Sequence, residues 1–379
     1  MNSKQRCQAA LAGKPVDRPP VTVIYSMLYF EDHFSEFTGL PAWELVRWLN
    51  SEPDEYFRLF KLMHDQVPFE MLQPHMVPPL IERQASEFIN RDGRLVRRNR
   101  LTGIVEDRMS VSGHAKDYAA NETQKIFSRR DITRQIVVPD PQELASEGCN
   151  AYLEKFVETM GDEYYIISGG VVGTIYSCGW YLGQQNTLAM LLEQPDLVDN
   201  VCQRITEQNF ATIQQLALAG GDAIYIDDAT ATSDMVSLKH YERFSLPYMT
   251  QMVSEIHRLG HQAILIYFGG VMDRLEAIAS TRADGLLIET SMKGYTNDIA
   301  EAVRRAGNSL TLFANIDPLG ILQNASDAGL ESEVQRQFTA GRSGRSFVLS
   351  TASPITPGTP LSRVQKFLEL GISLSYSSG

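Results

Sequence analysis

Two adjacent carboxylates, Asp227 and Asp228, follow an apolar run at residues 223–226 and are the pair in this chain best suited to chemistry. An apolar run that ends in acidic residues places them where a strand meets a loop. Two carboxyl groups in one sheltered site raise each other's pKa, so one can serve as a general acid, a substrate anchor or a metal ligand. Adjacent residues of an extended chain point to opposite sides. We therefore expect one of the two to face the site, while the other caps a turn or meets solvent.

The same layout recurs further along the chain. Apolar runs near residues 263, 285 and 310 are followed by a glycine pair, by Glu289 and by Asp317. Glu289 is expected either to share a proton or a metal with Asp227 or to form a structural salt bridge. Asp317 precedes a proline and favours a turn. A series of buried strands with polar residues at their C-terminal ends predicts an α/β fold, a (β/α)8 TIM barrel with its site on that face.

The remaining sequence supplies the other elements of such a barrel, since a strand and its crossover helix together need about 25 to 40 residues. Asp92-Gly93, between two apolar stretches, favours a tight hairpin turn. We predict one domain over residues 1–379, with an N-terminal extension and a hairpin excursion at about 85–138. Strands are expected at 21–25 and 164–168 and near 223, 263, 285, 310 and 346, and helices at 4–12, 41–62 with a break near Pro53, 188–219, 238–259, 270–281, 296–306 and 328–340.

The composition limits the classes of partner and compartment. A formal charge of −12 and a pI near 5.1 argue against non-specific binding to nucleic acid or to an anionic membrane, because both need broad positive potential. The four cysteines show no CxxC spacing and indicate reduced thiols. No stretch has the apolar length of a signal-peptide core or a membrane span. We therefore expect a soluble, cytoplasmic protein.

Several short motifs, in order along nearly the whole chain, resemble those of the uroporphyrinogen decarboxylase superfamily. This resemblance implies the same (β/α)8 barrel, with an active site in its C-terminal cleft, and makes a homodimer an expectation by analogy. The motifs are Gly13-Lys14-Pro15-Val16-Asp17-Arg18-Pro19-Pro20, Gly220-Gly221-Asp222-Ala223, Leu246-Pro247-Tyr248, Gly260-His261, Gly269-Gly270, Asn315-Ile316-Asp317-Pro318 and Ser353-Pro354-Ile355-Thr356-Pro357-Gly358-Thr359-Pro360.

The chain departs from two branches of that superfamily. True uroporphyrinogen decarboxylases carry arginines after the first strand and a late-loop histidine, whereas residues 24–30 contain no arginine and Ser353 takes the place of the histidine. Thiol-activating methyltransferases hold zinc through a His-x-Cys pair and a late cysteine. Those three positions are Ile266, Phe268 and Ser353 here, so this zinc site is expected to be absent. Zinc held by Asp227, Glu289 and a histidine stays open.

The pattern that remains resembles the first-step methyltransferases of the superfamily. The resemblance implies transfer of a methyl group from a methoxylated, aromatic or related small molecule to cob(I)alamin, which is carried by a separate corrinoid protein or added free. The expected catalytic residues are Asp227, Asp228 and Glu289, because the departing oxygen needs a proton or a Lewis acid. The expected substrate contacts form an aromatic-rich set: Tyr25, Met27, Tyr29, Phe30, Trp180, Tyr181, Tyr267, Phe268 and Ser353.

Two other functions fit the same residues. The first is a decarboxylase or lyase that acts on a small acidic substrate and uses the same carboxylates as proton donors. The second is a non-catalytic sensor or scaffold, against which the retained carboxylates argue. His257 and His261 are expected at a helix C-terminus, and His64 or His75 in a loop that reaches substrate. A basic cluster is expected on the wet face of the hairpin or as a contact for an acidic partner or substrate: Arg94, Arg97, Arg98 and Arg100.

Overall fold

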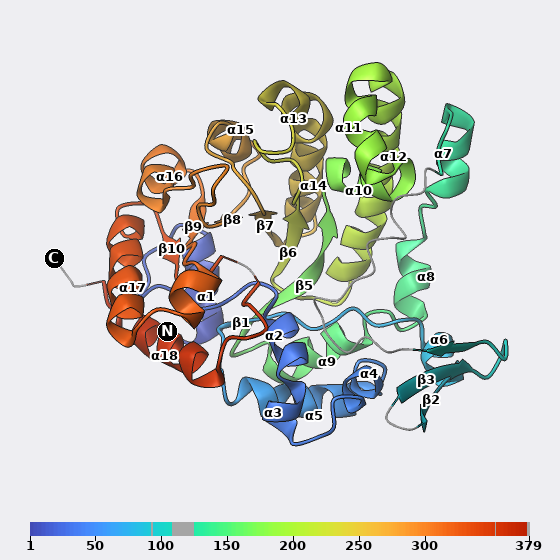
Figure 1. Ribbon diagram of the computed structural model, residues 1–379, viewed down its shortest axis with the longest axis horizontal. Helices are drawn as coiled ribbons and strands as arrows, with labels where there is room; N and C mark the ends of the chain where they lie inside the picture. Colours follow the sequence, from blue (N-terminus) through green and yellow to red (C-terminus); the bar gives the residue numbers. More distant parts are fainter. Residues whose placement is uncertain (92–93, 108–124, 353, 377–379) are drawn as a thin grey trace.

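A curled parallel sheet forms the centre of the molecule (Figure 1). The computed structural model describes residues 1–91, 94–107, 125–352 and 354–376. Seven strands pair in the order β1-β5-β6-β7-β8-β9-β10, and they match the predicted positions from residue 164 onward. Their bounds are β1 (Met71–Leu72), β5 (Tyr165–Val172), β6 (Ala223–Asp227), β7 (Gln262–Tyr267), β8 (Gly285–Ile288), β9 (Thr311–Phe313) and β10 (Phe347–Val348).

The segment after Pro20 closes this sheet into a barrel. Leu349 N donates to Pro20 O at 2.8 Å, and Thr22 N donates to Leu349 O at 3.0 Å. On the other side Glu70 N donates to Val21 O at 3.1 Å, just before β1. Val21 therefore occupies the eighth strand position, although only a single parallel bridge, to Leu349, is regular there. The predicted (β/α)8 TIM barrel is confirmed, and the predicted strand at 21–25 is an irregular segment that ends where a helix begins.

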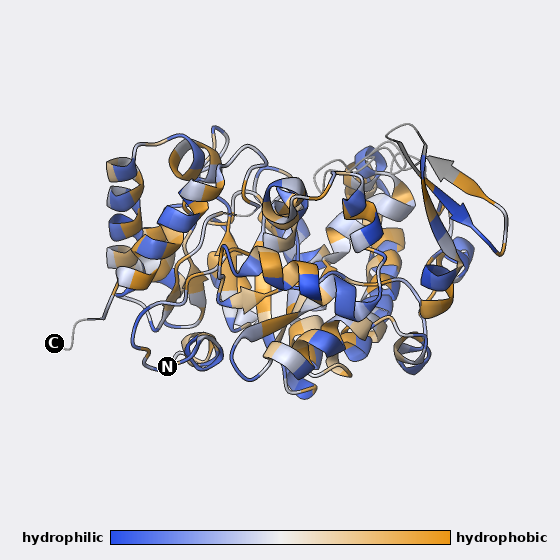
Figure 2. Cartoon of the chain, turned by 90° about the horizontal axis from the view of Figure 1, so that it is seen from below, coloured by the Kyte–Doolittle hydropathy of each residue, from blue (hydrophilic) through white to orange (hydrophobic). Residues whose placement is uncertain are grey.

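Alternation along the strands divides the core into two layers. Inside the barrel lie residues such as Ala223, Ile264, Ile266 and Leu287, and Cys7 from the N-terminal helix packs with them. Their immediate neighbours along the strands point outward into a larger apolar layer beneath the helices. Figure 2 shows this arrangement as apolar strands at the centre and mixed apolar and polar helices around them. Successive residues of one strand thus meet different surroundings.

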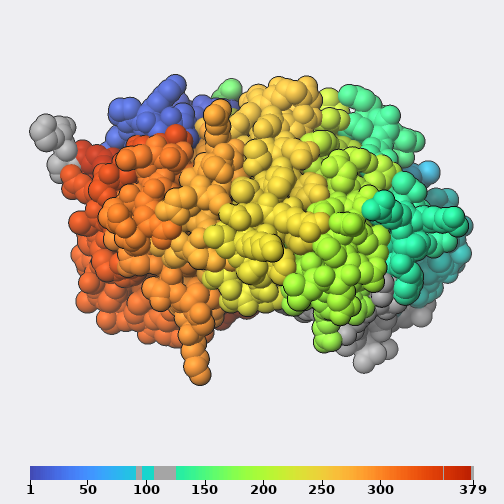
Figure 3. Space-filling model, turned by 90° about the horizontal axis from the view of Figure 1, so that it is seen from above, coloured from blue at the N-terminus to red at the C-terminus, as the bar shows by residue number. Residues whose placement is uncertain are grey.

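The helices of the later repeats lie side by side in chain order, from green through yellow to orange and red in Figure 3. The predicted helix at 238–259 is two helices, and Pro247 lies in the first turn of the second one. The helices after β5 are α10 (Thr174–Leu182), α11 (Gln184–Glu193), α12 (Pro195–Ala217), α13 (Leu238–Phe244), α14 (Leu246–Arg258), α15 (Leu275–Ser280), α16 (Ile299–Ala306), the π-helix η2 (Pro318–Gln323), α17 (Asp327–Gly341) and α18 (Leu361–Ser373).

The N-terminal part adds helices and a small separate sheet. The predicted break at Pro53 is confirmed, since this proline is the first residue of α5. The predicted hairpin is also confirmed, because β2 (Ser86–Arg91) and β3 (Arg94–Asn99) pair antiparallel with Arg91 opposite Arg94, and β4 (Val105–Asp107) adds to β3. The helices are α1 (Ser3–Leu11), α2 (Ser26–Asp32), α3 (Phe34–Thr38), α4 (Glu44–Trp48), α5 (Pro53–His64), α6 (Leu80–Ala85), α7 (Arg129–Gln135), α8 (Pro141–Ser146) and α9 (Ala151–Met160).

None of the helices in the described ranges combines the length and apolar character needed to cross a lipid bilayer.

A buried ion-pair network lies beside the closing segment. The Glu70 carboxylate accepts hydrogen bonds from Arg6 Nη1, from Arg18 Nη1 at 2.7 Å and from Val21 N at 2.7 Å. Arg6 also donates to Asp17, at 2.7 and 2.8 Å. Glu70 thus connects α1, the closing segment and β1. Removing one partner of a buried ion pair leaves the charge of the other partner buried and unpaired. The stability of the protein is therefore sensitive to substitutions in this network.

We predict that Glu70→Gln lowers the free energy of unfolding by about 3 kcal/mol, because the neutral amide removes the carboxylate charge that Arg6 and Arg18 share in this buried network. Urea unfolding followed by circular dichroism measures this change. Glu301→Gln is the control, since Glu301 pairs with Arg304 on an exposed helix face and its loss should leave the midpoint nearly unchanged. An unchanged midpoint for Glu70→Gln would show that closure does not depend on this carboxylate.

Candidate active site

The two adjacent carboxylates lie on opposite sides of β6. Asp227 follows Ala223 and Tyr225 on the face that turns into the barrel, and its Oδ2 accepts a 2.8 Å hydrogen bond from the Tyr25 hydroxyl. Asp228 is fully buried on the outer side, where the Ser245 hydroxyl at the start of α14 donates to its Oδ2. Gly173, before α10, leaves room for the Asp228 carboxyl, which a Cβ there would meet. Asp227 is therefore the carboxylate that faces the barrel interior.

The buried position of Asp228 changes the pKa of its carboxyl group. Burial is the largest cause and raises the pKa of Asp228 to about 7. The Ser245 hydroxyl and the Arg274 guanidinium act to lower this pKa, and the Asp227 carboxylate acts to raise it. Arg274 is buried as well and donates to the carbonyls of Ala231 and Val236, which fixes the loop after β6. The expectation that Asp228 belongs to the site does not fit this position, because its side chain points into the layer beneath the helices.

Tyr25 has an unusual backbone conformation at the start of α2. Its φ of 60° and ψ of 31° lie in the left-handed region, which costs a non-glycine residue free energy that the surroundings must offset. Tyr25 N donates to Gln73 Oε1 at 3.0 Å, and the ring packs edge-on against Tyr225 and at a tilt against Phe268, with centroids 5.4 and 6.2 Å away. Strain held by several contacts is typical of a functional site.

Two members of this group, Tyr225 and Gln73, were not among the predicted site residues. Tyr225 lies two residues before Asp227, and this period-two spacing is the signal that places both on one face. Gln73 follows the two-residue strand β1, where no sequence pattern marks it. Burial raises the pKa of both Tyr25 and Tyr225 well above the usual value, and the neighbouring Asp227 carboxylate adds to the rise. Both phenols therefore stay protonated, and Tyr25 donates its proton to the hydrogen bond with Asp227.

Glu289 is a second inward residue at the carboxyl edge of the sheet. Burial raises its pKa to about 7, the Thr290 amide at 2.7 Å opposes the rise, and Asp317 adds to it. The register aligns Asp227 with Ile266 and Ile266 with Leu287, so β7 stands between the two carboxyls. Two strand spacings put them on the order of 10 Å apart. The expectation that Glu289 shares a proton with Asp227 does not fit this register, and Asp317 is the carboxylate that acts on it.

Two buried asparagines hold the loop that carries Glu289. Asn297 Nδ2 donates to the carbonyls of Gly269 and Glu289, at 2.9 and 3.0 Å. Asn315 Nδ2 donates to the same Glu289 carbonyl at 3.1 Å and to Asn297 O at 2.9 Å. These bonds join the loops after β7, β8 and β9. Asp317 caps η2 through bonds to Leu319 N and Gly320 N, which confirms the predicted turn role.

Some of the predicted aromatic substrate contacts lie near Asp227, and others lie in the outer core, the apolar layer beneath the helices. Phe268 and Tyr25 lie together inside the barrel. Tyr267 points outward by strand alternation, and its hydroxyl pairs with that of Tyr241 at 3.0 Å, so it does not lie with Tyr25 and Phe268. Tyr29 is also placed in the outer core, where its hydroxyl donates to Thr359 O at 3.0 Å.

The positions of the other predicted substrate contacts depend on the helices that carry them. Phe30 is fully buried in the outer core, and Tyr181 packs against that core with its hydroxyl donating to Gln208 on α12 at 3.3 Å, so neither lies with Tyr25. Met27 is half-buried in the first turn of α2. Trp180 packs edge-on against Tyr176, four residues earlier on α10. Ser353 lies outside the described residues.

The histidines His64, His75 and His257 contact other residues of the chain. His64 is buried and bonds Phe69 O, and His75 lies between the Tyr56 hydroxyl and the Glu31 carboxylate, both at 2.6 Å. His257 pairs with Asp284 near the end of α14. In the described part of the chain no three histidine, cysteine, aspartate or glutamate side chains are grouped to hold a metal. Ile266 and Phe268 are apolar and cannot ligate zinc.

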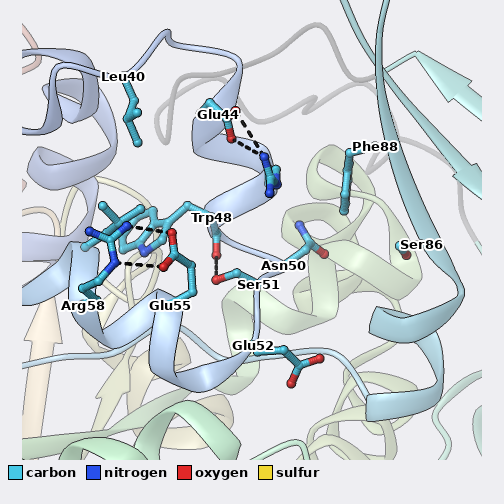
Figure 4. A pocket seen from close by; sticks show the side chains of 12 residues that line it. Leu40, Glu44, Trp48, Asn50, Ser51, Glu52, Glu55, Arg58, Ser86 and Phe88 are labelled. Atoms are coloured by element: carbon cyan, nitrogen blue, oxygen red, sulfur yellow. Dashed lines mark hydrogen bonds and ion pairs between the residues drawn. The ribbon is translucent and has the colours of Figure 1, made fainter.

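A pocket of about 510 Å³ lies away from these residues, between α4, α5 and β2 (Figure 4). Glu55 pairs with Arg58 at 2.9 and 2.8 Å, and Glu44 lies 3.4 Å from Arg47. On the neighbouring hairpin Arg97 pairs with Glu82 at 2.7 Å, and Arg100 lies 3.7 Å from Glu87. Two of the four clustered arginines thus lie close to acidic side chains of the same region.

Curated relatives match part of the chain. Uroporphyrinogen decarboxylase of Coxiella burnetii (strain Dugway 5J108-111) is 31% identical over 187 residues, which are 48% of this chain and 48% of that protein. Uroporphyrinogen decarboxylase 2, chloroplastic, of Oryza sativa subsp. japonica is 28% identical over 188 residues, 49% of this chain and 46% of that protein. The chain thus spans about half the length of the curated relatives it matches.

Among solved structures, a methyltransferase from Methanosarcina mazei has the same fold over nearly the whole chain. The TM-score is 0.67 at 19% identity, with 98% of each chain covered. The family model described as uroporphyrinogen decarboxylase (URO-D) matches residues 116–372, which include every strand from β5 to β10 and both inward carboxylates. With this match and the closed barrel together, the chain belongs to the uroporphyrinogen decarboxylase family.

Proposed function

We propose that this protein is a methyltransferase that removes a methyl group from a small methoxylated aromatic compound and delivers it to a corrinoid. The observation that carries the proposal is the strained Tyr25, which donates to Asp227 and packs against Tyr225 and Phe268 at the carboxyl edge of the barrel. The rings of Tyr25, Tyr225 and Phe268 suit a planar substrate. Each buried carboxylate of a tetrapyrrole would need a cationic partner, whereas residues 24–30 contain no arginine. The fold shared with a methyltransferase supports the proposal.

Cleavage of an aryl methyl ether sets the demands on the protein. The bond from the methyl carbon to oxygen breaks, its electron pair stays on the oxygen, and the methyl carbon bonds to the acceptor. The departing phenolate then takes up a proton. Glu289 is suited to hold that proton, because its pKa of about 7 keeps a large fraction protonated near neutral pH. Asp227, held by Tyr25, is suited to accept a hydrogen bond from a hydroxyl group beside the methoxy group.

The reduced corrinoid supplies the nucleophile that accepts the methyl group, and in this proposal it arrives on a separate protein. The chain itself need only bind and orient the donor, exclude water and supply a proton. Tyr225 and Phe268 provide rings that can stack on a planar donor. Activation of a thiol by zinc does not fit these residues, since Ile266 and Phe268 stand at the ligand positions that the family resemblance implies.

The proposal is tested by incubating the purified protein, without oxygen, with chemically reduced free cobalamin and a panel of monocyclic methoxylated compounds. Chromatography measures the released phenol. The expected result is demethylation that needs both the protein and the reduced cobalamin. Release of carbon dioxide from a small carboxylic acid without any demethylation would contradict the proposal and favour the decarboxylase alternative. Tight binding of uroporphyrinogen with no thermal shift from methoxyaromatics would contradict it as well.

The two neighbouring aspartates give a matched pair of variants. Asp227→Asn should lower the rate of demethylation by about 10² to 10⁴, because the carboxylate that orients the donor loses its charge while its shape is kept. Asp228→Asn should keep nearly the wild-type rate, since Asp228 lies outside the barrel with Ser245. Thermal unfolding of both variants checks that they fold. Equal rates for Asp227→Asn and the wild type would remove Asp227 from the mechanism.

The pH profile tests Glu289. If Glu289 donates the proton, kcat/KM should fall as the pH rises through about 7, because the acidic form is lost above its raised pKa. Glu289→Gln should lower the rate by about 10² to 10⁴ and remove this fall, since the amide does not titrate. Asp317→Asn is the control for the charge that acts on Glu289, and it should shift the fall to lower pH. A fall that persists unchanged in Glu289→Gln would assign the titration to another group.

A further inference from the structure

A second pocket, of about 210 Å³, lies at the opposite end of the barrel from Asp227 and Glu289. Arg345 and Ser346 directly precede β10, whereas the candidate active-site residues follow the ends of their strands. Because the strands are parallel, residues before a strand and residues after a strand lie at opposite ends. In Figure 1 the N-terminus lies beside α17 and α18. The lining residues are Lys14, Pro15, Val16, Arg342, Gly344, Arg345, Ser346 and Tyr376.

The charge of this pocket is positive. Lys14, Arg342 and Arg345 line it, and none of the described residues that line it is acidic. Within the described ranges none of these three cations forms an ion pair. The acidic residue nearest in sequence, Asp17, pairs with Arg6 and the N-terminal amine instead. An uncompensated cluster of this kind is unusual on a chain with a formal charge of −12, and it attracts an anion.

The position of Arg345 is fixed from two sides. Its Nη2 donates to Leu11 O at the end of α1, at 2.6 Å, and its backbone N donates to Gly307 O at 2.8 Å. Gly13, with a φ of 65°, leaves the space that the guanidinium occupies, since a Cβ there would lie 2.8 Å from Arg345 Nε. The guanidinium is therefore held in place before any ligand arrives, which reduces the entropy lost on binding.

Three polar groups of the pocket are buried without a protein partner. Among the described residues, nothing accepts or donates a hydrogen bond at Arg345 Nε, Ser346 Oγ or the Tyr376 hydroxyl. The Ser346 side chain belongs to a residue only 8% exposed. Burial raises the pKa of Tyr376 to about 12, against the opposing effect of Arg342, so this phenol is a neutral donor. Buried polar groups are normally paired, and all three of these groups belong to residues that line the pocket.

We propose that this pocket binds a phosphate group. Two guanidinium groups, an ammonium and two hydroxyls supply many donors and three positive charges, which match the three oxygens and nearly two negative charges of a phosphate better than a singly charged carboxylate. The phosphate comes either from free inorganic phosphate or from a small phosphate monoester, and both present the same group to the pocket. The site lies apart from the proposed methyl-transfer residues and does not depend on that function.

Isothermal titration calorimetry with inorganic phosphate and, separately, with glycerol phosphate tests the proposal. The expected result is saturable binding of at least one of them, and the tighter one identifies the source. Lys14→Gln combined with Arg342→Gln should weaken binding at least about tenfold, and Tyr376→Phe by a smaller factor, because charge-assisted bonds contribute more than neutral ones. Arg129→Gln combined with Arg130→Gln is the matched control: it removes the same charge from exposed positions on α7 and should leave binding unchanged.

A second measurement does not depend on variants. Hydrogen exchange of the backbone at residues 342–346 should slow when phosphate is added to the wild-type protein, while exchange in the loops after β6 and β8 stays the same. No saturable binding up to about 10 mM of either compound would overturn the proposal. Binding that the control pair weakens as much as the pocket pair would also overturn it, as would protection confined to the loops at the carboxyl edge.

Discussion

The closure of the barrel by the segment after Pro20 is the constraint on which the rest of the structure depends. This segment is held between Leu349 and Glu70 by only a few backbone hydrogen bonds, and the Glu70 carboxylate adds bonds to Val21 N and to two arginines. Because the closing segment is short, its far end at Tyr25 must turn at once into α2. The left-handed backbone of Tyr25 is the result, and it directs the phenol toward Asp227.

Strand alternation then decides which polar groups share an environment. Asp227 and Asp228 are neighbours in sequence, yet one faces aromatic rings inside the barrel and the other lies between strand and helix with Ser245. Glu289 reaches the interior by the same rule, one strand beyond β7. Two carboxyls at separate positions around an aromatic wall can perform two tasks, one orienting a substrate and the other exchanging a proton.

The two ends of the barrel differ in charge and in the way they are held. At the carboxyl edge, asparagine side chains join successive loops, and the inward groups are phenols, apolar rings and carboxyls. At the amino end, α1 is fixed by arginines, and Arg345 continues this pattern into a cationic pocket. Membership of the uroporphyrinogen decarboxylase family accounts for the scaffold, while the chemistry depends on the residues placed on it.

The sequence by itself determined the barrel, the hairpin, the break at Pro53 and the presence of carboxylates at strand ends, because alternation, turn residues and strand ends are local patterns. It also indicated that only one of Asp227 and Asp228 faces inward, but not which one. That choice depends on which face of β6 turns into the barrel, and tertiary packing sets this. Tyr267, Tyr29 and Tyr181 are of the same residue type as Tyr25 and Tyr225, and only the register and the helix faces assigned them to the layer beneath the helices. Gln73, the strain at Tyr25 and the grouping of Lys14, Arg345 and Tyr376 come from contacts between segments far apart in sequence, which no local pattern encodes.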